Sequence, residues 1–540
     1  MKIKLLLIFL LFSSVKLFAQ VEDAWVYFSD KPSETVFVSA PLTMLTQRAI
    51  DRRTRYNIPI DFKDIPVEAS YIAQVQSAVG INVKAKSKWL NAVHVQGLQS
   101  DINNLLNLNF VVQIEYANKS LNTSGKEVIH KKNIQKKKSL DFKTDFNYGN
   151  ASNQIQMLKG DVLHQNNFTG DGIQIAIIDA GFPDVDNFTA FQVIRENNQI
   201  LGGYDFVNRN DNFYSGHYHG MSVLSTIAGY IDNEFIGTAP NAKFYLFISE
   251  DYLNETPLEE SLWVEAAERA DSLGVDVINT SLGYTTFDNP NYNYSYNDMD
   301  GQTTFISRGA EIAFSRGMIV VNAAGNEGSS SWKYISAPAD APSVLSIGAV
   351  DAFGVIANFS SFGPTVDGRI KPDVCAQGAN VYIINSSGNI ATSNGTSFAS
   401  PIITGVIACL WQAFPNKTNA EIIQLVKESS HLYTNPTAQE GYGIPDFEVV
   451  YDILDLEKKE NEITDFLLFP NPAKTSINFK FPVDVENIGV SIYNLLGKKV
   501  FQKNIQKNNP TADISYLAKG IYMVQIEGDN NIKTLKLLKN

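Results

Sequence analysis

The sequence predicts an α/β protein with a doubly wound, mostly parallel sheet, preceded by a small α+β unit and followed by a small β-sandwich. Three observations predict this architecture. Residues 148–456 alternate short apolar strands with longer helix-like segments, which is typical of a parallel sheet covered on both faces. Residues 21–125 mix strands with helices. Residues 465–540 contain evenly spaced strands separated by turns, as small β-sandwiches do.

Length and charge limit the function. A chain of 540 residues is too long for one domain, and its 44% hydrophobic content supplies ample core. The net charge of −13 argues against nucleic acid as a partner, because phosphate binding requires a basic surface.

Residues 1–20 resemble a secretory signal peptide. Lys2 and Lys4 precede an apolar run at 5–12, and the small residue Ala19 offers a cleavage site. The run is too short for a comfortable membrane span, and no later stretch approaches about 20 apolar residues. We therefore expect an exported protein.

The first unit is predicted from local periodicity, and it contains no cluster of residues that suggests chemistry. The expected strands are 24–29, 35–38, 81–85, 92–95 and 110–115, and the expected helices are 44–53, 69–79 and 100–106. A lysine-rich linker follows at 126–147, and we expect proteolytic cutting within 126–143, because exposed linkers are where nicking concentrates.

The middle unit has the strongest alternation of strands and helices. The expected strands are 173–178, 244–249, 275–280, 318–322 and 344–350, and the expected helices are 219–230, 258–273, 303–315 and 401–413. In such sheets, functional residues gather at the carboxyl ends of the strands, where Asp179 and residues 322–326 fall.

The last unit follows a Lys/Glu-rich linker at 457–464 and shows no catalytic cluster. The expected strands are 466–469, 476–481, 488–493, 499–504, 520–526 and 532–538, with turns at 471–472, 496–497 and 528–530.

Ser397 lies in the stretch around which the middle unit is organised, residues 394–405 (NGTSFASPIITG). Pro401 suits the first turn of a helix, since it lacks an N–H that would have no partner there. We therefore expect Ser397 at or just before a helix N-terminus, where backbone donors favour a developing negative charge. The structural alternative is an N-cap serine ahead of an ordinary core helix.

Asp179 and His219 supply the other residues that a serine nucleophile needs. A base must take the serine proton, and a carboxylate must orient that base and stabilise its charged form. The order Asp, His, Ser occurs in one of three unrelated triad folds, and the absence of a Gly-x-Ser-x-Gly elbow argues against an α/β-hydrolase. His217 and His219 suggest a metal pair, but no third ligand is nearby, so we predict no metal there.

Asn326 lies in a glycine-rich segment after a buried strand. Its carboxamide N–H₂, together with the backbone N–H of Ser397, is suited to stabilise an oxyanion. Taken alone, an asparagine in such a segment is more often a turn residue.

These motifs together resemble the subtilisin-like (subtilase, S8 family) serine proteases across residues 169–446. The matching segments are 170–181, 219–229, 279–283, 325–326 and 395–401, with 359–364 and 371–374 as further landmarks. The resemblance implies Asp179, His219 and Ser397 as a catalytic triad and Asn326 as the oxyanion residue. It also implies that Ser281, Leu282 and Gly283 line the cleft and pair with a bound polypeptide.

Two motifs depart from the family pattern. The family has Asp-Thr/Ser-Gly where this chain has Ala180 after the aspartate, and the second histidine of its His-Gly-Thr-His is replaced by Ser222. Neither change removes a triad member, so we expect activity with altered cleft details.

The flanking units extend the resemblance. Residues 21–116 resemble a subtilase propeptide, which implies an intramolecular chaperone and inhibitor of the protease. Residues 469–473, 493–497 and 517–522 resemble the C-terminal sorting domain of Bacteroidetes type IX secretion substrates. That domain implies outer-membrane secretion machinery as a partner.

Two smaller questions concern ligands and thiols. Asp298 and Asp300, in the tyrosine-rich segment 289–301, are candidate calcium ligands, although the spacing matches no known calcium loop and a plain surface loop is the alternative. No other cofactor is expected. Cys375 and Cys409 lie in apolar contexts, so we expect free thiols, although export permits a disulfide.

The sequence thus predicts a secreted serine endopeptidase. One alternative is a catalytically inactive, exported binding or adhesion protein on the same scaffold. A non-peptidase hydrolase, such as an esterase, is a weaker third possibility.

Overall fold

The structure is a computed structural model that describes residues 20–122, 146–461, 466–482, 485–528 and 531–540. The predicted signal peptide, apart from Gln20, and most of the basic linker lie outside these residues. The chain divides into two compact units, one ending at Val450 and one comprising Tyr451–Asn540.

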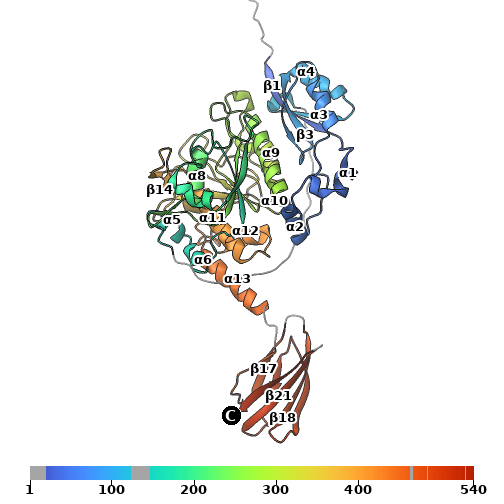
Figure 1. Cartoon of the computed structure of the whole chain (residues 1–540), viewed down its shortest axis with the longest axis vertical. Coiled ribbons are helices and arrows are strands. Elements are labelled where there is room, and N and C mark those ends of the chain that lie inside the picture. Colours follow the sequence, from blue (N-terminus) through green and yellow to red (C-terminus); the bar gives the residue numbers. More distant parts are fainter. Residues whose placement is uncertain (1–19, 123–145, 462–465, 483–484, 529–530) are drawn as a thin grey trace, which may run out of the picture. The chain divides into compact units, whose positions relative to one another are not determined.

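A seven-stranded, entirely parallel sheet forms the centre of the first unit (Figure 1), in the order β13-β12-β11-β10-β5-β9-β6. The strands are β5 (Gln174–Asp179), β6 (Ile200–Asp205), β9 (Lys243–Ile248), β10 (Val277–Thr280), β11 (Ile319–Ala323), β12 (Leu345–Val350) and β13 (Val374–Gln377). The five predicted strands are confirmed as β5, β9, β10, β11 and β12. Their continuous apolar runs suit strands that are buried on both faces. Two strands were not predicted: β6, which contains two glycines, and the short β13 at the sheet edge.

Helices cover both faces of this sheet, as expected for a doubly wound fold. α8 (His219–Ala228) packs against α11 (Thr396–Ala413), while α9 (Leu258–Leu273) packs against α10 (Phe305–Ser315) on the other side (Figure 1). α11 is the one helix of the described residues that is long and apolar enough to cross a membrane, but 89% of it is buried, as in a core helix. The remaining elements of this part are α5 (Ser152–Gln156), α6 (Asp161–Gln165), α7 (Gln192–Glu196), β7 (Tyr230–Ile231), β8 (Phe235–Ile236), β14 (Val381–Ile384), β15 (Ile390–Ser393) and α12 (Asn419–Glu428). The last helix, α13 (Phe447–Asn461), begins in the first unit and ends in the second.

The N-terminal part is a four-stranded antiparallel sheet in the order β2-β3-β1-β4. Its elements are β1 (Val21–Phe28), α1 (Glu34–Ser39), α2 (Gln47–Arg55), α3 (Ala69–Gln76), β2 (Asn82–Ser87), β3 (Ala92–Leu98), α4 (Gln99–Asn104) and β4 (Val111–Tyr116). The predicted strand at 35–38 is wrong, because this segment forms the short helix α1. Its β-branched residues have no neighbouring strand to pair with, and Glu34 favours a helix start.

This N-terminal sheet packs on α9 and α10 of the central part (Figure 1). The Trp25 ring stacks on Phe305 at 4.8 Å, and its Nε1 donates to Ser261 Oγ at 2.8 Å. Glu268 of α9 accepts hydrogen bonds from Ser87 Oγ and from the Trp89 N–H, at 2.6 and 2.9 Å.

The C-terminal unit contains two antiparallel sheets, β16-β17-β20 and β19-β18-β21-β22. Its strands are β16 (Leu467–Phe469), β17 (Ser476–Lys480), β18 (Asn487–Asn494), β19 (Lys499–Gln506), β20 (Thr511–Asp513), β21 (Gly520–Gly528) and β22 (Asn531–Lys539). Inward-facing residues alternate with exposed ones, as in a sandwich. The predicted linker at 457–464 begins inside α13, which continues to Asn461.

Candidate active site

Asp179 is the last residue of β5, an inner strand of the parallel sheet, and is fully buried. Neighbouring strands β9 and β10 flank it in parallel register, so its side chain emerges at the carboxyl edge of the sheet. Its Oδ1 accepts a hydrogen bond from the Ala180 N–H at 2.7 Å, while Oδ2 is buried and has no partner among the described residues.

His219 is the first residue of α8, and backbone hydrogen bonds on both sides of it join the chain to the end of β5. The His217 N–H donates to the Ala180 carbonyl at 2.9 Å, and the Met221 N–H donates to the Gly181 carbonyl at 3.1 Å. Gly220 permits this approach, because a Cβ there would lie 2.8 Å from the Asp179 Cβ. As a result, His219 Nδ1 lies 2.7 Å from Asp179 Oδ1.

The Asp179 carboxylate determines which ring nitrogen of His219 carries the proton. An ionised carboxylate only accepts, so Nδ1 donates and Nε2 is left as the basic nitrogen. Burial by itself lowers the pKa of His219, but the charge and hydrogen bond of Asp179, together with the charge of Glu250, raise it above the ordinary value. The pair can therefore accept and hold a proton.

Ser397 lies in the first turn of α11, after Gly395 at the N-cap with a φ of 150°. The residue is 9% exposed, and its Oγ donates to the Ser281 carbonyl at 3.3 Å. Its N–H is among the first four of the helix, which have no partner inside the helix. The serine is therefore at a helix N-terminus, as the sequence predicted.

The prediction that Pro401 lies in the first turn of the helix is wrong. Helix α11 begins at Thr396, so Pro401 lies inside it. Proline has no N–H, so the carbonyl four residues earlier, that of Ser397, lacks its helical donor. Ser281 Oγ supplies the missing hydrogen bond at 2.8 Å. Because Pro401 leaves this carbonyl free, a hydrogen bond joins the start of α11 to the segment that follows β10.

The packing of α8 against α11 brings the neighbourhood of Ser397 to His219. The Phe398 ring lies 6.0 Å from the His219 ring, centroid to centroid. Within the described part of the chain, Ser397 Oγ is hydrogen bonded to Ser281 rather than to His219. Catalytic hydrogen bonds are often long until substrate is bound, so this geometry is compatible with a base at His219.

Asn326 follows β11 and faces the start of α11. Its Oδ1 accepts hydrogen bonds from the Thr396 N–H at 2.9 Å and from Thr396 Oγ1 at 3.0 Å. Because the backbone N–H only donates, these contacts set the orientation of the carboxamide and leave Nδ2 unused by Thr396. Nδ2 lies 3.8 Å from the position that a Cβ on Gly395 would occupy. The asparagine therefore lies beside the turn that carries Ser397.

Ser281, Leu282 and Gly283 continue from β10 along the site. Asn322 Nδ2 donates to the Leu282 carbonyl at 3.2 Å, and the next residue, Tyr284, pairs with Ala337 in an antiparallel bridge. A Cβ on Gly283 would lie 2.0 Å from Ser336 Oγ. The segment is thus held in place beside Ser397.

Glu250, which sequence reasoning missed, is buried close to Asp179 and His219. It follows β9 and accepts hydrogen bonds from Ser249 Oγ at 2.5 Å and from Tyr284 OH at 2.6 Å. Burial, with repulsion from other carboxylates, raises the pKa of Glu250 to about 8. Its position after a strand of the parallel sheet was the one available signal.

The carboxylates of segment 289–301 are engaged within the protein. Asp298 forms an ion pair with Lys119 Nζ at 2.7 Å and accepts a hydrogen bond from the Ser295 N–H at 2.7 Å, while Asp300 accepts one from the Gln302 N–H at 2.8 Å. A lysine ammonium at Asp298 does not suit a bound calcium ion. No group of three or more His, Cys, Asp or Glu suited to a metal occurs among the described residues.

Cys375 in β13 and Cys409 in α11 are both buried free thiols. The prediction that they are unpaired is confirmed. Burial raises the pKa of Cys409 well above its ordinary value, which makes it unreactive.

Comparison with known proteins identifies three regions. Residues 170–445 match the subtilase family (Peptidase S8), residues 23–138 match the Bacteroidota Peptidase S8 propeptide domain, and residues 467–540 match the secretion system C-terminal sorting domain. Subtilisin from Bacillus pumilus is 31% identical over 54% of this chain and 94% of its own length. Subtilisin NAT from Bacillus subtilis subsp. natto is 31% identical over 54% of this chain and 68% of its own. A solved protease structure from Pseudoalteromonas arctica is 22% identical with a TM-score of 0.46, over 57% of this chain and 99% of that one.

Proposed function

Because this chain belongs to the subtilase family, we propose that it is a secreted serine endopeptidase whose nucleophile is Ser397. The observation that carries the proposal is the 2.7 Å contact between His219 Nδ1 and Asp179 Oδ1, beside the helix that presents Ser397. The C-terminal sorting domain makes it a secreted or cell-surface protein.

In the proposed reaction, Ser397 Oγ attacks the scissile carbonyl carbon while its proton passes to His219 Nε2. Asp179 stabilises the imidazolium that forms. His219 then gives the proton to the leaving amine, and a water molecule hydrolyses the acyl-enzyme by the same route.

The negative charge on the substrate oxygen requires donors that are already in place. We assign this role to Asn326 Nδ2 and the Ser397 N–H, since Asn326 Oδ1 is held by Thr396 and the Ser397 N–H starts a helix. Ser281, Leu282 and Gly283 would pair with the peptide backbone of a polypeptide substrate, with cleft details altered by Ala180 and Ser222.

The N-terminal part matches a propeptide domain, and we assign it the role of inhibitor and chaperone of the central part. Cutting within 126–143 would separate the two. The outer-membrane secretion machinery would recognise the C-terminal unit.

Two measurements test the assignment of Ser397. Purified protein freed of its propeptide should hydrolyse casein, and Ser397→Ala should abolish this activity with unchanged thermal unfolding. A fluorophosphonate probe should label Ser397. Retained turnover in Ser397→Ala, or labelling at another residue, would refute the assignment.

The rival proposals differ in these measurements. An inactive binding or adhesion protein would neither hydrolyse casein nor react with the probe. An esterase would react with the probe and cleave ester substrates but not amides. Calcium binding at Asp298 and Asp300 stays a proposal, tested by the effect of a chelator on the unfolding temperature of the propeptide-free protein.

A further inference from the structure

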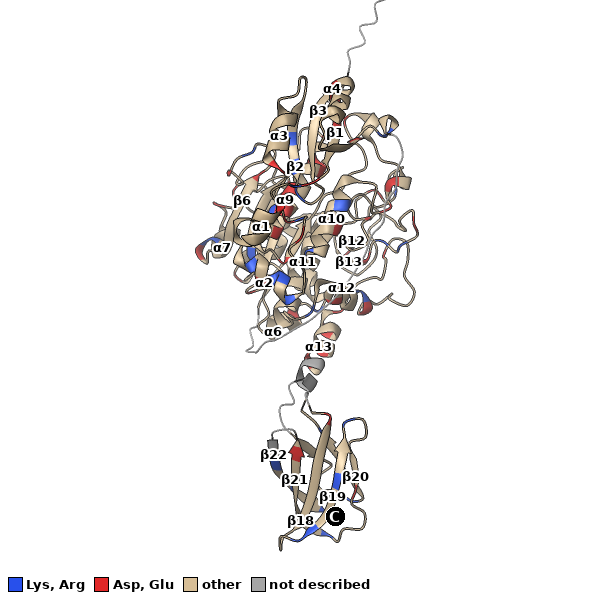
Figure 2. Ribbon diagram, turned by 90° about the vertical axis from the view of Figure 1, so that its right-hand side faces the viewer, with Lys and Arg blue, Asp and Glu red and all other residues tan. Residues whose placement is uncertain are grey.

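Residues 46–65 of the propeptide, which we call the arm, lie outside the propeptide sheet. They contact the C-terminal ends of α9 and α10. The arm contains α2, whose N-cap Thr46 donates its N–H to the Ser272 carbonyl at 2.8 Å. Figure 2 shows basic residues on α2 and acidic residues on α9. The propeptide therefore contacts the peptidase part through two surfaces, its sheet and its arm.

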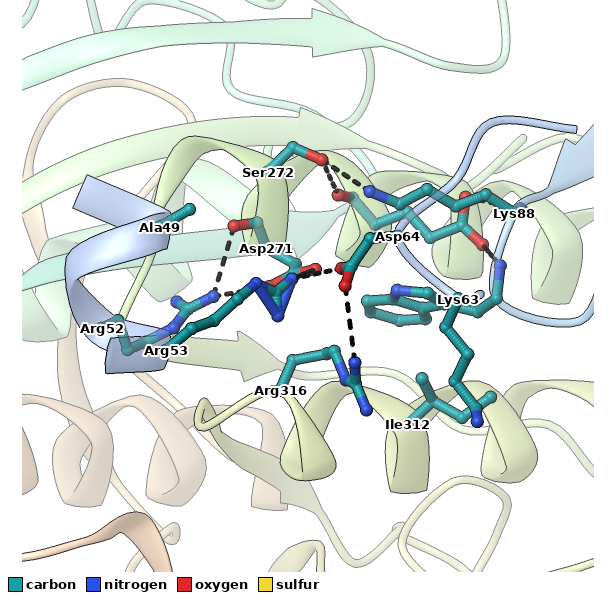
Figure 3. Close-up of polar contacts among 12 residues, drawn as sticks. Ala49, Arg52, Arg53, Lys63, Asp64, Lys88, Asp271, Ser272, Ile312 and Arg316 are labelled. Atoms are coloured by element: carbon teal, nitrogen blue, oxygen red, sulfur yellow. Dashed lines mark hydrogen bonds and ion pairs between the residues drawn. The ribbon is translucent and has the colours of Figure 1, made fainter. Parts of the chain in front are cut away.

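Two consecutive arginines of the arm share one aspartate of α9. Arg52 Nη2 lies 2.5 Å from Asp271 Oδ1, and Arg53 Nη2 lies 2.7 Å from Asp271 Oδ2 (Figure 3). The three side chains are 3%, 2% and 0% exposed. Burial raises the pKa of Asp271, but the charges of the two arginines lower this pKa by more than burial raises it. The carboxylate therefore stays ionised.

The network continues from the arm to the end of α10. Arg53 Nη2 also lies 2.6 Å from Asp64 Oδ1, and Arg316 Nη1 lies 3.7 Å from Asp64 Oδ2 (Figure 3). Arg316 Nη1 lies 3.1 Å from Asp61 Oδ2 as well. The two arginines of the arm thus pair with Asp271 of α9, and Arg316 of the peptidase part pairs with aspartates of the arm. A network of this kind is sensitive, because removing one buried partner leaves an uncompensated charge.

Backbone and aromatic contacts complete the surface. Arg52 also donates to the Val275 carbonyl, and Arg48 pairs with Asp276. A Cβ on Gly274, which ends α9 with a φ of 85°, would lie 2.8 Å from the Ala49 N–H nitrogen. Tyr56 stacks on Trp411 at the end of α11, with ring centroids 6.2 Å apart.

This surface lies at the edge of the sheet opposite the candidate active site. Val275 and Asp276 directly precede β10, so the arm lies at the amino ends of the strands, whereas Asp179 ends β5 at their carboxyl ends. The arm therefore cannot enter the cleft. Its contacts can therefore hold the propeptide on the peptidase part without touching the candidate active site.

We propose that Asp271, the 274–276 turn and Arg316 form an exosite for the arm, which retains the propeptide on the peptidase part after the linker is cut. The partner that fits is a helix carrying two adjacent arginines, followed by aspartates that reach Arg316. The proposal rests on the assigned inhibitory role of the propeptide only for its consequence, delayed activation; retention itself requires no catalysis.

The test uses the full chain with Ser397→Ala and a site for a sequence-specific protease inserted within 126–138. After cutting, release of the labelled propeptide is followed by size-exclusion chromatography and by dilution kinetics. We expect Arg53→Met to release the propeptide about 100-fold faster or more, because Asp64 and Asp271 are left without their shared cation. Arg55→Met, which changes an exposed arginine of the same helix, should stay within about threefold of the parent.

A second variant covers the case in which Arg53→Met fails to fold. Arg53→Lys keeps the charge but loses the planar fork that bridges the two carboxylates, and should release the propeptide about tenfold faster. Release at the parent rate in either variant would overturn the proposal. Because Ser397→Ala is used throughout, failure of the proposed peptidase activity leaves this result unaffected.

Discussion

Ser281 Oγ donates a hydrogen bond to the Ser397 carbonyl at 2.8 Å, and that carbonyl is available because Pro401 has no N–H to offer it. Ser397 Oγ in turn donates to the Ser281 carbonyl at 3.3 Å. The candidate nucleophile and the cleft segment are thus joined in both directions, although 116 residues separate them.

Ser281→Ala should therefore lower the free energy of unfolding by about 1–3 kcal/mol, because a buried carbonyl loses its donor. The matched control is Ser336→Ala, since Ser336 is also buried beside this segment but its Oγ has no partner among the described residues. Denaturant unfolding on the Ser397→Ala background measures both. Equal losses in the two variants would contradict the role given to Ser281.

If Asn326 is the proposed oxyanion donor, Asn326→Ala should reduce kcat by about 10²–10³, the loss known in subtilisin on removal of one oxyanion-hole donor, with little change in KM. The physical reason is that Nδ2 meets charge that develops only in the transition state. Progress curves on a peptide amide substrate give the two constants. A change confined to KM would remove Asn326 from the proposed oxyanion hole.

The pH dependence of kcat/KM should show an acid limb with its midpoint above pH 6.5. His219 must be neutral to accept the Ser397 proton. Burial lowers the pKa of His219, but Asp179 raises it more, so activity is lost as pH falls through the raised value. Asp179→Asn should move the midpoint to lower pH and cut kcat by about 10⁴. The exposed Asp211→Asn serves as the control, and an unmoved midpoint in Asp179→Asn would refute the pairing.

Glu250→Gln should stabilise the protein increasingly as pH rises. The folded state holds the pKa of Glu250 at about 8, against 4.5 ordinarily, so folding retains a proton that the unfolded chain releases. The parent therefore loses stability between these values, at up to about 1.4 kcal/mol per pH unit, and the glutamine variant does not. Denaturant unfolding at about pH 5 and at about pH 9 measures the difference in unfolding free energy between the parent and the glutamine variant. Glu234→Gln, at an exposed site, should show no such trend; a pH-independent gap for Glu250→Gln would refute the argument.

Much of the fold could be predicted from the sequence, because local periodicity carries it. Helix α9 has the predicted bounds, and five strands of the parallel sheet are short apolar runs between helical segments, the pattern that predicts a sheet covered on both faces. The segment at 35–38 shows the limit of this reasoning. Its β-branched residues predicted a strand, but strand formation depends on a neighbour that the sequence alone does not reveal.

The candidate site divides in the same way. By itself the sequence determined the candidate residues, since Asp179 and His219 occur in motifs whose order is specific. The structure brings these two residues into hydrogen-bond contact. Only the tertiary structure decided that Pro401 lies inside α11, that Glu250 is buried near Asp179, and that Arg53 meets Asp271 across 218 residues of chain. These features depend on which distant groups share a buried space and satisfy one another's charges and hydrogen bonds, and local residue patterns do not contain that information.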